Sequence, residues 1–195
     1  MTTDVIDRLL EVREGDPLHT LRLQRPDAKT NAQASFDALF HSNELGHASQ
    51  LERLAIAYWT VALSQSPAAS FYRDLLAAED RGTLDLLEAA LPGAVTTGPY
   101  GDYPAGPLTV ENVAGLRWQT DAALAESVGP RLAAALAHTH LLVYRPRDSS
   151  ADALQALLDA GWSTTGIVTL SQLVAFLSFQ LRVVAGLTIL KGDLA

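Results

Sequence analysis

Residues 163–190 read STTGIVTLSQLVAFLSFQLRVVAGLTIL, and Ile167 to Leu190 is the longest apolar stretch of this 195-residue chain. Ser163 precedes what we predict to be the last and longest helix, ending near Leu190. The stretch is long enough to consider as a membrane span, but it contains Arg182, and an arginine in mid-bilayer costs at least ~2.5 kcal/mol. We therefore expect no membrane span. We expect instead a helix buried in protein, partly at a subunit interface.

The rest of the chain also favours helices. Alanine and leucine dominate its apolar residues, which make up 48% of the sequence, and both are good helix formers. Ser49-Gln50-Leu51-Glu52 fits a capping box, with an apolar stripe at i, i+3 and i+4 spacing after it. No alternating run is long enough to predict a strand. The sequence therefore predicts an all-α fold.

Turn signals divide the chain into segments. Residues 18–30 are polar and contain proline, and residues 93–107 are rich in glycine, proline and tyrosine, so we expect neither segment to be helical. Ser66-Pro67 favours a helix start and Pro92-Gly93 a helix stop. The expected helices are about 5–12, 32–41, 50–62, 67–79, 83–91, 110–117, 121–128, 130–144, 151–160 and 164–190.

A weak internal sequence similarity suggests that the chain consists of two related halves. Tyr72-Arg73 is followed by LDLLEAA and a Pro-Gly stop, and Tyr144-Arg145 by LQALLDA and a glycine stop. We predict a single domain over residues 1–195, with one half at about 1–92, a linker at 93–108 and a second half at about 109–195.

Composition excludes several classes of function. The chain has 14 basic and 22 acidic residues, a net charge of −8, so its surface would repel a phosphate backbone and we expect no nucleic-acid partner. The N-terminus lacks a basic region followed by an apolar core, so we expect a cytoplasmic protein. The chain contains no cysteine, which leaves no thiolate nucleophile and no disulfide.

The C-terminal part of the chain resembles a known family. AHTHLLVYRPRD at 137–148 is followed by LLDAGWSTTGIVTLSQLVAFLSFQLRVVAGL at 157–187. This order of helix, proline turn, short helix ending in Ala-Gly and final arginine-containing helix is similar to the carboxymuconolactone decarboxylase superfamily, on its alkylhydroperoxidase D-like, peroxidase-related side. The resemblance implies an alkylhydroperoxidase D-like helical bundle that assembles as a homodimer or a ring of dimers. Residues 41–77 lie where that family has its redox helices.

The resemblance also implies where the family's chemistry would lie. Its redox members join a glutamate to a Cys-x-x-Cys pair and a histidine. By spacing, Glu52 falls at the glutamate position, Ser64 and Pro67 at the cysteine positions, and Phe71 at the histidine position. Thiol peroxidase activity is therefore not expected. Our leading hypothesis is a peroxidase-related protein without redox cysteines. It would keep a pocket near Glu52, Ser64 and Phe71 that binds a small apolar molecule or supports a non-thiol reaction.

Two alternatives stay open. One is a non-redox enzyme nearer the decarboxylase branch, acting on a small carboxylated or lactone substrate, which would need a cation and a proton donor. The other is a purely structural or interaction protein. For the enzyme, the candidate cations are Arg53, Arg73 and Arg182, and the candidate proton donors are His41, His47 and Glu52.

Each candidate catalytic or histidine residue also has a simpler interpretation. Glu52 closes the capping box of Ser49, and Ser64 lies at a helix junction. His41 and His47 could approach a pocket or, with Glu44, bind a metal, but their spacing matches no ligand pattern and we predict no metal site.

The other candidates can likewise be explained by packing. Tyr58, Phe71 and Tyr72 suit either a core or an apolar pocket. Arg182 is expected to form an ion pair that fixes helix packing or a subunit contact, or else to bind an anionic ligand. His138 and His140 point to different helix faces, so one is expected in the core and the other at an interface. No cofactor is predicted.

Overall fold

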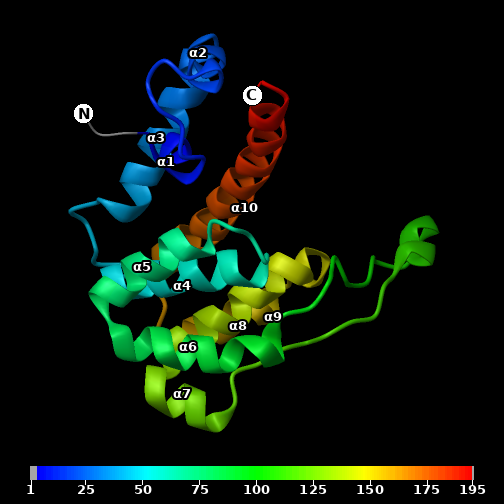
Figure 1. The fold of residues 1–195 in the computed structure, drawn as a ribbon. Helices are drawn as coiled ribbons and strands as arrows, with labels where there is room; N and C mark the ends of the chain where they lie inside the picture. The colour runs from blue at the N-terminus through cyan, green and yellow to red at the C-terminus, as the bar shows by residue number, and fades with distance from the viewer. Residues whose placement is uncertain (1–3, 195) are drawn as a thin grey trace.

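The computed structural model describes residues 4–194, and over that range it has ten α-helices, two short 3₁₀-helices and no strand (Figure 1). The predicted all-α fold is confirmed. The ends of the two predicted halves, residues 1–3 and 195, lie outside the described residues. The elements are α1 (Val5–Leu9), α2 (Pro17–Leu23), α3 (Pro26–Phe40), α4 (Gln50–Leu63), α5 (Ala69–Glu79), α6 (Arg81–Ala94), η1 (Pro107–Glu111), α7 (Ala122–Val128), α8 (Pro130–Tyr144), η2 (Pro146–Asp148), α9 (Ala151–Asp159) and α10 (Thr164–Asp193).

Helix α4 is the centre of the core. Every residue from 53 to 63 is buried, because α4 packs against α5, α8 and α10 on different sides. The indole of Trp59 is fully buried and donates through Nε1 to the carbonyl of Leu136 on α8 at 3.2 Å. A helix that is apolar nearly all round belongs inside a bundle, and α4 has that position.

Helix α10 joins the two ends of the molecule. Its first half packs against α4 and α8, and its second half extends to α1, α2 and α3 (Figure 1). The ammonium of Lys191 donates to the carbonyl of Leu10 at 2.7 Å. Among residues 4–194, α10 alone is long and apolar enough to cross a membrane, and only 28% of its most apolar window is buried. The expected burial in protein therefore holds for one face of the helix only.

The segment 18–30, expected to be non-helical, contains α2 and the start of α3. Each of these helices has its proline at the first helical position, Pro17 and Pro26. The first backbone N–H of a helix has no intrahelical partner, so proline costs nothing there and its fixed φ suits the helix. Those prolines start helices rather than marking a loop.

Two further expected boundaries are wrong, and one expected helix does not form. Helix α6 runs through Pro92 to Ala94, with the amide of Val95 still donating to Leu91 at 3.0 Å. Helix α5 begins at Ala69 rather than beside Pro67, because Ser66 Oγ accepts from the Ala68 amide two residues on and forms a turn. The helix expected at 110–117 is absent: only η1 forms, and the residues after it are extended.

Residues 101–117, here called the arm, extend away from the bundle (Figure 1). Gly101 and Val113 exchange two backbone hydrogen bonds of 2.9 and 3.1 Å, which pair the two sides of the arm. The amide of Tyr103 also donates to the side chain of Asn112 at 2.7 Å. Every residue from 104 to 117 is exposed. Without an apolar stripe packed on the bundle, nothing stabilises a helix here.

Candidate functional site

The two predicted catalytic residues lie at opposite ends of α4. Glu52 is the third residue of the helix, and Ser64 is its C-cap. Twelve residues at 1.5 Å per residue place them about 18 Å apart along the helix axis. The structure therefore does not bring Glu52 and Ser64 into one pocket, which corrects the expected site.

Glu52 has a structural role in this arrangement. Its Oε2 accepts from the Ser49 amide at 2.8 Å, so the predicted capping box is confirmed. Its Oε1 accepts from Arg131 Nε on α8 at 2.5 Å. The guanidinium of Arg131 also donates to the carbonyls of Gly161 and His47, and it stacks 4.1 Å from the Trp162 ring. Both carboxylate oxygens are occupied, and Glu52 ties α4 to α8.

The two predicted histidines are both exposed. His47 lies beside the Glu52 network, with Nδ1 3.1 Å from Ser163 Oγ at the start of α10. His41 lies at the end of α3, with Nδ1 2.9 Å from the carboxylate of Asp37. The two histidines therefore have different neighbours, and their side chains do not meet at one site.

Ser64 and Arg182 do come together. Both line a groove of about 420 Å³ between the α4–α5 turn and α10, with Gln65, Ser66 and Pro67. Ser64 Oγ donates to its own helix, to Thr60 O at 2.8 Å. Arg182 is exposed, donates to Ser178 O at 2.7 Å, and has no acidic partner among residues 4–194. An ion pair of Arg182 that fixes helix packing is therefore absent among residues 4–194, and an ion pair at a subunit contact stays a prediction.

The predicted aromatic residues belong to the core. Tyr58 and Tyr72 are buried, and Phe71 is half-buried with the Arg8 guanidinium 4.9 Å from its ring. The Tyr72 hydroxyl donates to Gln180 Oε1 on α10 at 2.5 Å. Burial raises the pKa of Tyr72. Tyr58, Phe71 and Tyr72 line neither this groove nor two larger cavities of about 610 and 850 Å³.

His138 and His140 are both buried inside the chain, so the expectation that one lies at an interface is wrong. His140 Nε2 lies 3.0 Å from the carbonyl of Ala94. Burial lowers the pKa of each histidine, and the nearby charge of Arg145 adds to the effect on His140.

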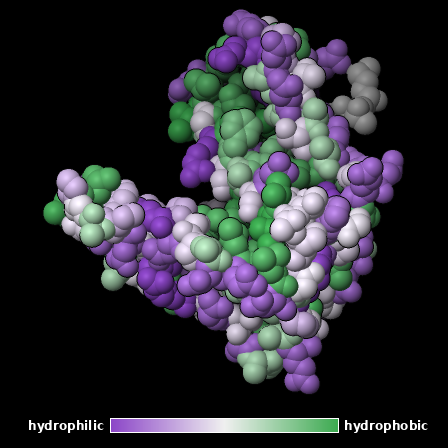
Figure 2. Space-filling view, turned by 180° about the vertical axis from the view of Figure 1, so that it is seen from behind, coloured by the Kyte–Doolittle hydropathy of each residue, from purple (hydrophilic) through white to green (hydrophobic). Residues whose placement is uncertain are grey.

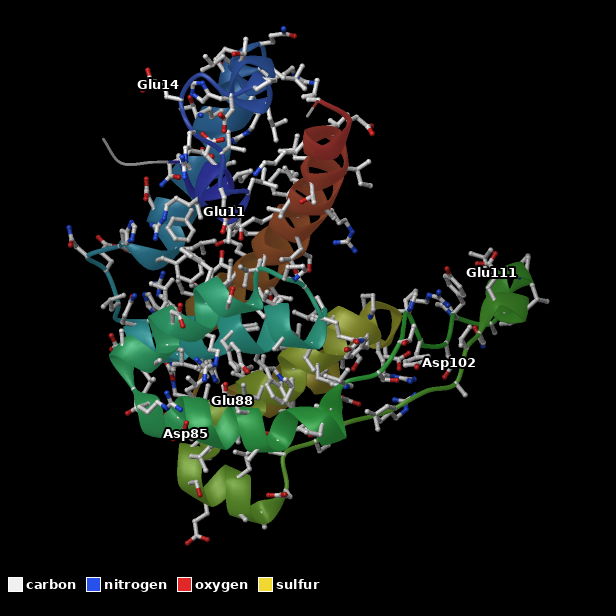
Figure 3. All side chains as sticks on the ribbon, in the orientation of Figure 1. Glu11, Glu14, Asp85, Glu88, Asp102 and Glu111 are labelled. Carbon is white, nitrogen blue, oxygen red and sulfur yellow. The ribbon has the colours of Figure 1, made fainter. Side chains whose placement is uncertain are left out.

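The largest of these cavities lies elsewhere, between α1 and α3. This cleft has a volume of about 850 Å³, which is in the usual range for small-molecule sites. Glu14, which Figure 3 labels in the connection between α1 and α2, is one of its lining residues. The lining residues are Asp4, Asp7, Val12, Arg13, Glu14, His19, Leu23, Pro26, Lys29, Thr30, Gln33, Ala34 and Asp37.

A buried charge network forms one wall of the cleft. Arg22 Nη1 lies between the carboxylates of Asp4 and Asp7, 2.8 Å from Asp4 Oδ1. Lys29 pairs with the other oxygen of Asp7. Buried charges require such partners, because an unpaired ion costs far more in desolvation than it gains. The negative charges of Asp4 and Asp7 balance the positive charges of Arg22 and Lys29, and the network joins α1, α2 and α3.

One atom of this network has no partner. Asp4 Oδ1 accepts from the amide of Asp7 and from Arg22, but Oδ2 is buried and has no hydrogen-bond partner among the described residues. Asp4 is only 8% exposed and lines the cleft. A buried carboxylate oxygen without a donor is costly, so this atom marks where a donor from water or a ligand would be favourable.

The sequence alone did not indicate this cleft. The two members of each ion pair in its wall are separated by 15 to 22 positions in the chain. Only the packing of α1, α2 and α3 brings them together. One signal was present: Asp4 and Asp7 are spaced as an N-cap and the third helical residue. Within residues 4–194 no group of three or more metal-ligating side chains is arranged to hold a metal ion.

Comparison with known proteins identifies no relative. No family model, no curated protein and no solved structure matches the chain.

Proposed function

We propose that this protein binds a small molecule in the cleft between α1 and α3, and that it is a cysteine-free relative of the alkylhydroperoxidase D-like proteins that has no thiol chemistry. The observation that carries the binding proposal is the buried, unpartnered Oδ2 of Asp4 on the wall of an 850 Å³ cleft. The order of α8, the Pro146 turn, α9 and α10 supports the relationship.

The lining of the cleft indicates the ligand class. Asp4 Oδ2 needs a donor, so the ligand carries an N–H or O–H group. Val12 and Leu23 offer it an apolar surface. Glu14 and Asp37 also line the cleft, and with Asp4 and Asp7 they outnumber its two basic residues, Arg13 and Lys29. This net negative charge favours an amine over an acid. A small amine or alcohol with a hydrocarbon part fits these features better than the wholly apolar molecule expected from the sequence.

A thermal-shift and calorimetry panel tests this proposal. Small alkylamines and alkyl alcohols are the probes, and carboxylic acids of the same carbon skeleton are the comparison. We expect the amines or alcohols to raise the melting temperature and to bind in calorimetry, whereas the acids do neither. If no amine or alcohol binds at millimolar concentration, the proposal is wrong.

Two matched variants locate the binding. Ala34 lines the cleft and is exposed, so Ala34→Trp fills the cleft without touching the charge network. Ser35 is the next residue on α3, is also exposed and does not line the cleft, so Ser35→Trp is the control. Binding lost in Ala34→Trp and kept in Ser35→Trp supports the cleft. Equal binding by both variants contradicts it.

A second candidate function rests on Arg182. Its guanidinium lines the 420 Å³ groove beside Ser64 and has no acidic partner among the described residues, so it is available to bind a carboxylate. This favours the enzyme acting on a small carboxylated substrate. Arg53 donates to three backbone carbonyls and Arg73 pairs with Glu88, so neither is equally available. If the protein has this second function, we expect the carboxylic acids of the panel to bind, and Arg182→Gln to abolish their binding.

A further inference from the structure

The arm carries an ordered apolar surface that its own chain does not cover. Its residues are held by Arg147 Nη1, which donates to Glu111 O at 3.0 Å, and by Arg145 Nη1, which donates to Gly115 O at 3.0 Å. Exposed apolar side chains held together in this way mark an interaction surface. They are Leu108, Val110, Val113 and Leu116, with exposed fractions of 50, 87, 44 and 37%.

A groove of complementary character lies at another part of the molecule. It has a volume of about 610 Å³ and lies between α2 and α3 on one side and the second half of α10 on the other. Figure 2 shows hydrophobic residues both at the tip of the arm and over the end of the molecule that contains α2 and α10. The apolar side chains that line the groove are Ile6, Leu21, Ala28, Ala32, Phe179, Val183, Leu187 and Leu190.

The charges at the two surfaces are also complementary. Arg25 lines the groove and has no acidic partner among residues 4–194, whereas Arg22 and Lys29 are already paired with Asp4 and Asp7. Glu111 lies at the tip of the arm (Figure 3), and its carboxylate pairs with no described basic residue. A chain with a net charge of −8 repels its own copies in general, so association requires a local match of this kind.

We propose that the tip of the arm of one subunit docks in the α2–α3–α10 groove of a second copy of this chain. Val110 and Leu108 enter the groove, and Glu111 pairs with Arg25 at its edge. The arm extends away from the bundle (Figure 1), and none of its residues lines the groove of its own chain. The same contact covers the exposed apolar face on the second half of α10, where Phe179 is 50% and Leu190 42% exposed.

Because the chain contains no cysteine, an introduced pair gives a disulfide test without background. The test variant is Val110→Cys with Leu190→Cys, which joins the arm tip to the groove. The control is Val110→Cys with Val168→Cys, since Val168 is an exposed residue of α10 that does not line the groove. Under mild oxidation we expect the test variant to give a covalent dimer whose peptide map contains a 110–190 disulfide. Equal cross-linking of both variants, or none in the test variant, overturns the proposal.

Charge reversal gives an independent test. Sedimentation velocity measures the dissociation constant of the untagged protein, with circular dichroism confirming that each variant keeps its helical content. Glu111→Arg and Arg25→Glu are each expected to weaken association at least several-fold, and the double variant to restore most of the loss. The proposal is overturned if the double variant associates no better than the weaker single variant. It is also overturned if the wild-type chain is monomeric at every concentration, or if Val110→Asp leaves association unchanged.

Discussion

Arg131 Nε on α8 donates to Oε1 of Glu52 on α4 at 2.5 Å, while Glu52 Oε2 closes the capping box of Ser49. One carboxylate therefore satisfies a helix N-terminus and an arginine that also holds Gly161 and His47 through their carbonyls. The residue that the family resemblance places at a redox position is engaged entirely in packing.

The first prediction tests this role of Glu52. Glu52→Gln keeps the shape of the side chain but removes the charge-assisted bond to Arg131, so we expect the free energy of unfolding to fall by about 1–2 kcal/mol. Urea denaturation followed by circular dichroism measures the change. Glu126→Gln, at an exposed position of α7, is the matched control. A loss in Glu52→Gln no larger than in this control would contradict the structural role.

The second prediction concerns Tyr72 and Gln180, which are both fully buried. Gln180 Oε1 accepts from the tyrosine hydroxyl, while its Nε2 has no partner among residues 4–194. Tyr72→Phe leaves the whole amide unpaired, so it should cost about 1–3 kcal/mol of unfolding free energy. Adding Gln180→Leu removes the unpaired amide, so the double variant should recover much of the lost free energy of unfolding. Additive losses in the double-mutant cycle would show that the two side chains are not coupled.

The parts of the fold that local chemistry decides could be predicted from the sequence. The Ser49–Glu52 box and the start of α10 after Ser163 both occur as expected. In each case a side chain binds a backbone amide two or three residues away, so the information lies within one turn of helix. Errors occurred where proline was interpreted as a breaker, as at Pro26 and Pro92.

The site could not be predicted in the same way, because it depends on packing between helices. Asp7, Arg22 and Lys29 read as ordinary surface charges, and only the meeting of three helices makes them a buried network. Arg182 shows the reverse case: the apolar sequence around it suggested burial, yet its face of α10 is open. A helix that is apolar all round does not reveal which face its neighbours cover.

The third prediction follows from the buried histidines of α8. Burial lowers the pKa of His138 and His140 in the folded chain, while an unfolded histidine has a pKa near ~6.5. Below that pH the unfolded chain binds more protons than the folded one, so stability falls as pH falls, by up to ~1.4 kcal/mol per pH unit for each histidine.

Melting temperatures between pH 7.5 and 5.5 measure this effect. His138→Gln and His140→Gln should each flatten the loss below pH ~6.5, relative to the wild-type chain. His41→Gln, at an exposed position, controls for the change of residue type. A wild-type melting temperature that stays constant over this range would contradict the prediction.

The last prediction concerns the order of the arm. A Cβ added at Gly115 would overlap the ring of Tyr100, whereas a Cβ at Gly106 meets nothing closer than the Pro104 carbonyl at 3.8 Å. Tyr100 is itself fixed, because its amide donates to Tyr144 O at 2.6 Å and its hydroxyl lies 2.8 Å from Thr96 Oγ1. We therefore expect Gly115→Ala to detach the base of the arm, with several-fold faster proteolysis and amide exchange within residues 101–117. Gly106→Ala should leave both rates near wild type. Because the arm contributes little to the core, the urea midpoint of Gly115→Ala should change far less than its proteolysis rate. A large fall in that midpoint would show instead that the arm stabilises the bundle itself.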